Sequence, residues 1–194
     1  MNGTMKIPRI EDLEIGELAH HYITESERIG MFDSLSVHQT DTIYSGEKLQ
    51  RYARPILKQP DGSAVVAVHG PDVICVAQYR PALQRFVIEI PAGRRAAGED
   101  PLATARRELQ EETGLGARNF SLLFRCSPAP CYSDLEASIF LATDLYILDQ
   151  PPSPDLPTIP CLLRIFDVEK LVAKGVLIDA KTIAGLLVAR EAIG

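Results

Sequence analysis

The segment between Gly93 and Leu115 constrains the fold of this chain most strongly, because it carries the start and stop signals of one helix. Asp100 can accept hydrogen bonds from the first turn, and Pro101 suits the first helical position because its missing N–H needs no partner there. Gly114 can adopt the left-handed conformation that ends a helix. The segment therefore predicts a helix of about three and a half turns. Its apolar positions recur at helical spacing and form one stripe: Leu102, Ala105 and Leu109.

The same helix carries a cluster of carboxylates. Glu108 and Glu112 are four residues apart and share a face, with Glu111 beside them, so the three are expected to converge. Like charges this close raise each other's pKa, which is normally tolerated where a cation sits among them. Mg²⁺, a hard ion that prefers oxygen ligands, suits such a site. We expect Arg107 to hold a ligand carboxylate, and the Gly93 loop to let the backbone approach the metal.

A solvated acidic helix is the alternative, since Glu, Arg, Gln and Ala are good helix formers. The wider spacing of the segment argues against it. In order, the fixed positions are Gly93, five residues, Glu99, seven residues, Arg107-Glu108-Leu109, one residue, Glu111-Glu112, one residue and Gly114-Leu115. This pattern fills every fixed position of the Nudix box, so the chain resembles the Nudix hydrolases.

Further segments resemble one branch of that family, the ADP-ribose pyrophosphatases, which also includes hydrolases of other nucleoside diphosphate sugars. These segments are residues 76–93, 127–134, 140–145 and 179–190. A proline shortly past the box is typical of the branch, and Pro130 fits. The resemblance implies an α/β fold, the Nudix α/β/α sandwich with a mixed sheet, from about residue 60 onward.

The resemblance also implies a metal-dependent reaction. The metal ligands would be the backbone carbonyl of Ala92 and the carboxylates of Glu108 and Glu112, with Glu111 as a further ligand or a base. Two or three Mg²⁺ ions, or Mn²⁺ in their place, would bridge the pyrophosphate oxygens and orient a water for in-line attack. ADP-ribose would yield AMP and ribose 5-phosphate. The supporting residues would be Gly93, Glu99 and Arg107.

The loop after the box departs from the family pattern. Aligned without a gap, Cys131 stands where glycine is common, and Leu135 stands where relatives carry a glutamate that serves as base or outer ligand. Glu136 is one place further along, and Asp134 precedes it by two. A one-residue shift in the loop would still direct Glu136 at the water, so we predict it as catalytic together with Glu111 and Glu112. In some relatives the catalytic carboxylate comes from elsewhere.

Arginines are the predicted substrate-binding residues: Arg51, Arg80 and Arg94. Arg80 matches a family arginine that contacts substrate phosphate, and a guanidinium suits bidentate recognition of phosphate oxygens. A structural salt bridge is the alternative role for Arg80.

In family members the N-terminal sheet commonly crosses to the partner subunit. Arg51, with Gln50 or Arg54, would then reach the neighbour's nucleotide in a homodimer. Alternatively, these arginines are only surface side chains of a strand. The chain has no tryptophan for stacking on adenine. Tyr44 or Tyr52 would substitute for it.

The chain is expected to divide into an N-terminal extension, residues 1–58, and a Nudix hydrolase domain, residues 59–194. Strand-like apolar positions from Phe32 to about Leu57 predict a small antiparallel sheet, which we expect to dimerise by strand exchange. Residues 1–31 show weak helical periodicity and no recognisable chemistry.

In the larger domain, nearly continuous apolar runs at 63–68 and 72–80 predict a hairpin buried on both faces. The proline-dense residues 150–160 predict an irregular loop. Asp167 and Asp179 are the predicted N-caps of two closing helices. Further strands are predicted over residues 86–93, 120–126, 137–145 and 161–166.

Composition excludes several classes of partner. The formal net charge of -6 argues against binding to a nucleic-acid backbone. No apolar run approaches the ~20 residues that span a bilayer, and the N-terminus lacks the pattern of a signal peptide, so we expect a cytoplasmic protein without a membrane partner. The four cysteines show no CxxC spacing and no histidine pairing, which favours free thiols over disulfides or a zinc site.

Three functions are consistent with these patterns. The first is Mg²⁺-dependent hydrolysis of ADP-ribose. The second is hydrolysis of another nucleoside diphosphate sugar, such as GDP-mannose or a UDP-sugar, because Thr158 and Cys161 stand where relatives usually carry an acidic pair. The third is a non-catalytic nucleotide-sensing Nudix module, which the altered loop favours and the intact box opposes.

Overall fold

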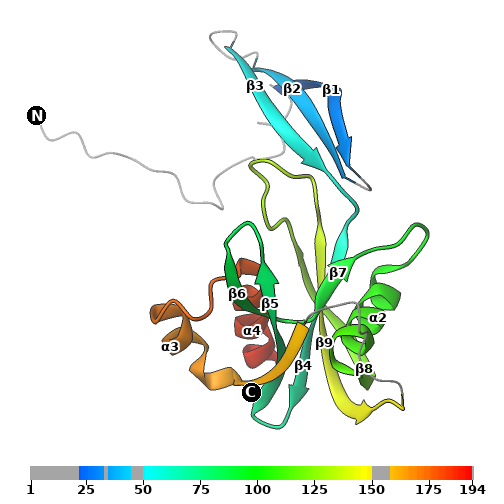
Figure 1. The fold of residues 1–194 in the computed structure, drawn as a ribbon, viewed down its shortest axis with the longest axis vertical. Coiled ribbons are helices and arrows are strands. Elements are labelled where there is room, and N and C mark those ends of the chain that lie inside the picture. The colour runs from blue at the N-terminus through cyan, green and yellow to red at the C-terminus, as the bar shows by residue number, and fades with distance from the viewer. Residues whose placement is uncertain (1–21, 33–34, 45–49, 150–157, 194) are drawn as a thin grey trace, which may run out of the picture. The chain divides into compact units, whose positions relative to one another are not determined.

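The chain forms two compact units, Met1–Lys58 and Gln59–Gly194, each of which is described by itself. The structure is a computed structural model (Figure 1), and it describes residues 22–32, 35–44, 50–149 and 158–193.

The first unit is a three-stranded antiparallel sheet in the order β1-β2-β3. Its strands are β1 (Tyr22–Phe32), β2 (Leu35–Tyr44) and β3 (Gln50–Lys58). The predicted small antiparallel sheet is confirmed, but it begins earlier than expected, because β1 pairs along its length with β2. Over residues 22–31 this cross-strand pairing overrides the weak helical periodicity, which local sequence alone could not reveal.

The second unit contains a seven-stranded mixed sheet with the central order β10-β5-β4-β9-β8. The central strand β4 runs antiparallel to β5 and parallel to β9, while β6 pairs with β5 and β7 with β4. The strands are β4 (Gly62–His69), β5 (Asp72–Arg80), β6 (Arg85–Glu89), β7 (Ala92–Arg94), β8 (Leu115–Cys126), β9 (Ala137–Ile147) and β10 (Thr158–Arg164).

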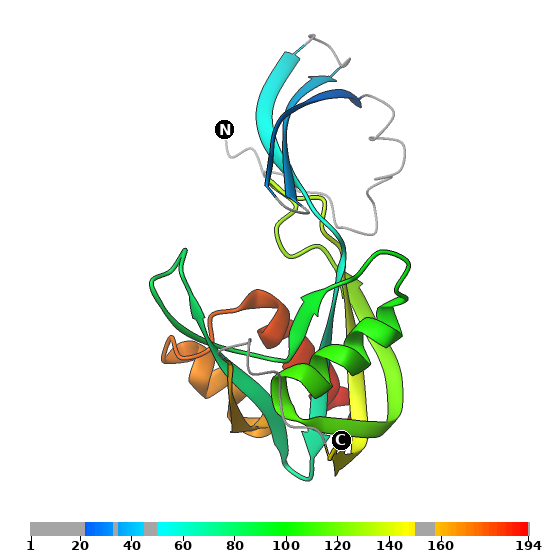
Figure 2. The same cartoon turned by 45° about the vertical axis from the view of Figure 1, so that its right-hand side comes forward.

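Helices cover both faces of this sheet, as Figures 1 and 2 show. Successive residues of β4 point to opposite faces: Val65 shares a core with Leu109 of α2 (Pro101–Thr113), and Val66 shares the other core with Leu186 of α4 (Ala180–Ile193). Between β10 and α4 lie a 3₁₀ turn, η2 (Ile165–Asp167), and the short helix α3 (Val168–Ala173). The α/β/α architecture is confirmed. β4 is buried on both faces as predicted, but β5 is only partly buried and its Tyr79 is exposed.

Several predicted strand boundaries are wrong; β8, for example, begins at Leu115 rather than at residue 120. The single strand expected over 86–93 is interrupted at Ile90 and Pro91, because β6 pairs with β5 whereas β7 pairs with β4. The last strand starts at Thr158, inside the proline-dense segment, and ends before Ile165. Pro160 is tolerated because β10 is the terminal strand in the sheet order, where one side needs no ladder hydrogen bond.

The predicted signals of the box helix are confirmed. The Asp100 side chain accepts hydrogen bonds from the N–H groups of Leu102 and Ala103, and Gly114 ends the helix at φ 71°. Asp179 caps α4 by accepting from the Thr182 N–H at 3.0 Å. Asp167 stands at the predicted N-cap position of α3, but its side chain makes no capping bond, because its backbone, at φ -95° and ψ 3°, is not in the extended conformation of a typical cap.

No helix in the described ranges is long and apolar enough to cross a membrane.

Candidate active site

Polar contacts attach the loop that leads into α2 to the start of β4. The Ser63 hydroxyl donates to the carbonyl of Pro101 at 2.7 Å. The Arg95 guanidinium pairs with the Asp61 carboxylate at 2.8 Å, and its backbone N–H donates to the Asp61 carbonyl at 2.8 Å. These contacts fix where α2 begins and therefore where its carboxylates lie.

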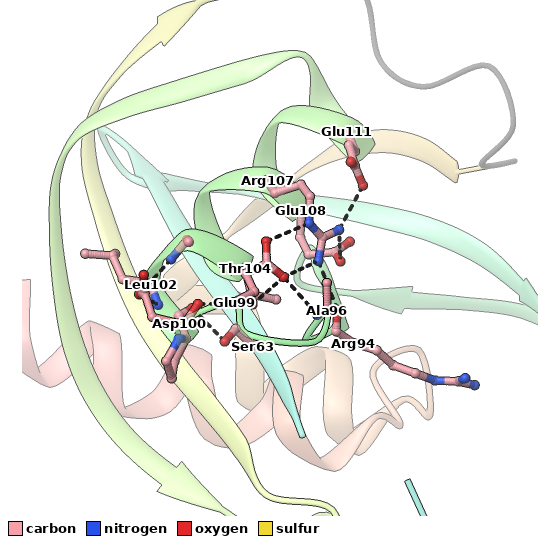
Figure 3. Close-up of polar contacts among 12 residues, drawn as sticks. Ser63, Arg94, Ala96, Glu99, Asp100, Leu102, Thr104, Arg107, Glu108 and Glu111 are labelled. Atoms are coloured by element: carbon pink, nitrogen blue, oxygen red, sulfur yellow. Dashed lines mark hydrogen bonds and ion pairs between the residues drawn. The ribbon is translucent and has the colours of Figure 1, made fainter. Parts of the chain in front are cut away.

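Arg107 is the centre of a charged network on α2 (Figure 3). Its guanidinium makes two bonds to the Glu99 carboxylate, at 2.9 and 3.0 Å. It also donates to Glu108 at 2.6 Å, to Glu111 at 3.0 Å and to the Arg94 carbonyl at 2.9 Å. Hydrogen bonds from Arg107 lower the pKa of Glu99 to about 2. The network brings together four of the residues that the sequence singled out and holds each carboxylate in place.

Glu99 also secures the turn before the helix. One carboxylate oxygen accepts from the Ala96 N–H at 3.0 Å and from the Thr104 hydroxyl at 2.9 Å. These bonds and the pair with Arg107 satisfy Glu99 within the protein, which suits a supporting role.

Gly93 lies against the carboxylate of Glu108. A Cβ added at Gly93 would overlap the Glu108 carboxyl group, and a Cβ added at Gly62 would lie 2.9 Å from the Gly93 carbonyl oxygen. A side chain at position 93 would therefore have to displace the Glu108 carboxylate.

Glu112 lies beside Glu108 and is almost completely buried, with 3% of its surface exposed. Its carboxylate accepts from the Ala92 N–H at 3.1 Å. Burial, reinforced by the negative charges of Glu108 and Glu89, raises the pKa of Glu112 to about 7. Burial likewise raises the pKa of Glu108, despite its pairing with Arg107. For neither carboxyl does neighbouring positive charge offset the effect of burial on the pKa.

The predicted donor set of Glu108, Glu112 and the backbone at Ala92 fits a divalent metal. In the described ranges, no three His, Cys, Asp or Glu side chains are arranged to hold a metal ion. Glu111 is partly exposed and shares the Arg107 guanidinium with Glu108, so its role as a further ligand or a base stays a prediction. Glu108, Glu112 and the backbone at Ala92 remain, and Mg²⁺ commonly binds one or two carboxylates together with substrate phosphates.

A cavity of about 260 Å³ opens beside Gly93 and Ala92. Its walls come from β4, β5, β7, β9 and the start of α4, and from the loop before β9. The charged residues among its lining are all cationic: Arg80, Arg94 and Lys181. An anionic ligand in this cavity would meet these cations next to the carboxyls of α2.

Glu89, which the sequence analysis missed, is a further buried acid behind the cavity. Its carboxylate binds the Arg80 guanidinium through two bonds, at 2.6 and 2.7 Å, and the Lys181 ammonium at 2.5 Å. Burial alone would raise the pKa of Glu89, but hydrogen bonds and charge from Arg80 and Lys181 outweigh it and lower the pKa. Its position inside the otherwise apolar residues 86–90 (FVIEI) was the signal that could have identified Glu89.

The loop before β9 is fixed through its backbone. The Glu136 N–H donates to Asp61 at 3.1 Å, and its carbonyl accepts from the Gly62 N–H at 3.0 Å. The Glu136 side chain is 56% exposed and lies 3.5 Å from Arg125, whereas Leu135 lines the cavity.

The remaining predicted contacts of the N-terminal unit lie outside what the structure describes. Arg51 belongs to β3, where it pairs with Ile43, but its side chain is not among the described groups. The same holds for the side chains of Gln50, Tyr44 and Tyr52.

A family model for the NUDIX domain matches residues 58–185, well over half of the chain. The chain belongs to the Nudix family. An ADP-ribose pyrophosphatase of Bacillus subtilis is 33% identical over 157 residues, which cover 73% of this chain and 85% of that protein. An ADP-ribose pyrophosphatase of Mycobacterium tuberculosis is 32% identical over 138 residues, covering 69% and 67%.

A crystal structure of an ADP compounds hydrolase has the same fold, with a TM-score of 0.74 at 22% identity, covering 87% of this chain and 91% of that one. Together with the sequence relatives, it confirms the predicted Nudix fold. The chain is a Nudix pyrophosphohydrolase of the ADP-ribose pyrophosphatase branch, as its motifs indicated.

Proposed function

We propose that this protein hydrolyses the pyrophosphate bond of ADP-ribose to AMP and ribose 5-phosphate with the help of Mg²⁺. The observation that carries the proposal is the buried pair Glu108 and Glu112, short of positive charge, beside a cavity whose charged wall is cationic. The names of the two bacterial relatives support ADP-ribose as the substrate.

In this proposal, Glu108, Glu112 and the Ala92 carbonyl hold the metal, with Arg107 and Glu99 fixing the first of these carboxylates. Two or three bound Mg²⁺ ions, or Mn²⁺, supply Lewis acidity to the pyrophosphate and acidify a water. Arg80 and Arg94 bind phosphate oxygens from the cavity wall, which orients the phosphorus for in-line attack.

Two carboxylates are the proposed candidates for the base that accepts the water proton. Glu111 is tied to Arg107 and Glu136 lies near Arg125, so either must exchange an ion pair for the water. Separate Glu111→Gln and Glu136→Gln variants decide between them. Loss of the base lowers kcat by about 100-fold or more, while loss of the other residue has a much smaller effect.

We also propose that the sheet of residues 1–58 mediates a homodimer and brings Arg51 to the partner's nucleotide. Among the described residues, β1 and β3 each pair with β2 alone, and an outer strand edge of this kind favours pairing with a second chain. Light scattering is expected to show a dimer, and Arg51→Ala to raise KM for ADP-ribose. A fully active monomer would contradict the proposal.

The direct test measures phosphate released after phosphatase coupling from ADP-ribose, GDP-mannose and UDP-glucose, with Mg²⁺, Mn²⁺ or EDTA. We expect ADP-ribose to give the highest kcat/KM and EDTA to abolish turnover. Preference for GDP-mannose or UDP-glucose would establish the second hydrolase function instead. No cleavage of any compound, combined with tight nucleotide binding, would establish a sensing module and contradict the proposal.

A further inference from the structure

Arg80, Glu89, Asp179 and Lys181 form one buried ionic cluster behind the cavity. Glu89 receives both Arg80 bonds on one side and the Lys181 ammonium on the other. Lys181 also binds Asp179 at 2.9 Å. Two carboxylates thus face two cations, and the cluster is balanced in charge without a metal.

The end of the cluster at α4 is rigid. Asp179 accepts from the Thr182 N–H at 3.0 Å and from its hydroxyl at 2.6 Å. The Thr182 hydroxyl also accepts from the buried Ile90 N–H at 3.0 Å, which ties the start of α4 to the segment between β6 and β7. Lys181 therefore extends from a fixed base toward Glu89.

Arg80 has space on two sides. It lines the cavity beside Gly93, and it also lines a second cavity, of about 360 Å³, between the turn after β5 and the start of α4. Leu83 and Ile178 are apolar residues of that second cavity. A long side chain between two open spaces can lie in either, so its orientation depends on Glu89.

The exposures separate the roles of the two cations. The Lys181 side chain is 16% exposed and its ammonium already binds two carboxylates, while the Arg80 side chain is 40% exposed. Arg80 uses Nε and Nη2 on Glu89, and within the part of the chain that the structure describes Nη1 makes no hydrogen bond. Of the two cations in this cluster, Arg80 is thus the more accessible to a ligand.

We propose that Lys181 and Glu89 are positioning residues that hold the Arg80 guanidinium toward the diphosphate of the ligand. The inference rests on the proposed function for the diphosphate, but not on which nucleotide or sugar carries it. Lys181 fixes the Glu89 carboxylate, Glu89 fixes the plane of the guanidinium, and the second cavity remains empty of the Arg80 side chain.

The test compares Lys181→Met, Lys181→Arg and the doubly neutral Glu89→Gln/Lys181→Met, with Lys174→Met as an exposed control on the same unit. We expect Lys181→Met to raise KM for ADP-ribose about tenfold while kcat changes less than about twofold, because a binding contact is lost. Lys181→Arg is expected to recover most of the KM, and Lys174→Met to leave it unchanged. The double variant leaves no unpaired buried Glu89 charge, so it should fold and still show the raised KM.

Calorimetric binding of inorganic pyrophosphate in EDTA separates this inference from the proposed activity. Weaker binding to Lys181→Met than to the wild type supports the positioning role even if the wild type does not cleave ADP-ribose. A lower melting temperature with unchanged pyrophosphate binding and unchanged KM would show that the cluster only stabilises the fold, and would overturn the inference.

Discussion

Glu89 and Glu112 are equally buried, each with 3% of its surface exposed, yet their pKa values are shifted in opposite directions. Glu89 contacts a guanidinium and an ammonium, and its pKa is lowered despite burial. Glu112 contacts one backbone N–H and lies near Glu108, and its pKa rises to about 7. Burial is the same for both residues, so the presence of a paired cation decides the sign.

The difference distinguishes a cluster whose charges are balanced within the protein from a pair of buried carboxyls whose charges are not. Around Glu89, the protein supplies its own positive charges from β5 and α4. Around Glu112, Arg107 is committed to Glu99, Glu108 and Glu111 and makes no bond to Glu112 within the described residues. A divalent ion at Glu108 and Glu112 would supply the missing charge.

The largest expected effect comes from removing the charge at Glu112. Glu112→Gln keeps the shape of the side chain and its contact with Ala92, but removes a proposed metal ligand. We expect kcat with Mg²⁺ to fall by at least about 100-fold, since outer-shell changes alone commonly reach that range.

The exposed Glu191→Gln is the matched control and should leave kcat unchanged. Equal turnover in wild type and Glu112→Gln would contradict the metal assignment and remove the contrast with Glu89.

The second prediction concerns stability in EDTA, where the two acids should behave oppositely. Because the pKa of Glu112 is raised from 4.5 to about 7, its stabilising contribution is present below pH 4.5 and lost as pH rises to about 7. The free energy of unfolding should fall by about 3 kcal/mol across this window. Urea denaturation at pH 5 and pH 8 measures the fall, which Glu112→Gln should largely remove.

The contribution of Glu89 to stability depends on pH in the opposite direction. Its pKa is lowered from 4.5, so its contribution is present above pH 4.5 and lost as the pH falls below that value. Glu89→Gln should destabilise the protein at pH 8 by about 3 kcal/mol, because Arg80 and Lys181 lose their shared partner. If Glu112→Gln and Glu89→Gln change the free energy of unfolding in the same direction at pH 8, the contrast between the two acids is wrong.

A smaller effect is expected from Gly93→Ala. The added methyl group would displace the Glu108 carboxylate, which Arg107 holds from the other side. We expect the Mg²⁺ concentration for half-maximal turnover to rise about tenfold. An unchanged Mg²⁺ dependence would show that Glu108 need not occupy this position.

The sequence predicted the box helix well because its determinants are local: Asp100, Pro101 and Gly114 act on neighbouring backbone groups. It could not predict the Glu89 cluster, whose partners Arg80 and Lys181 come from β5 and α4 and meet only in the folded sheet. The positions of the Glu111 and Glu136 side chains depend on their ion pairs, with Arg107 and Arg125 respectively. The early start of β1 depends on pairing with β2.

The central claim is that Glu108 and Glu112 hold the catalytic metal because protein cations do not offset their burial: Arg107 pairs with Glu108, and within the described residues no cation pairs with Glu112. Titration calorimetry of Mg²⁺ binding near pH 7, in buffers of different ionisation enthalpy, tests it most directly. The account predicts binding with release of a fraction of a proton, because Glu112 is partly protonated at this pH and must ionise to bind the metal. Binding and proton release should both be lost in Glu112→Gln. Equal Mg²⁺ affinity in wild type and Glu112→Gln, without proton release in either, would contradict the account.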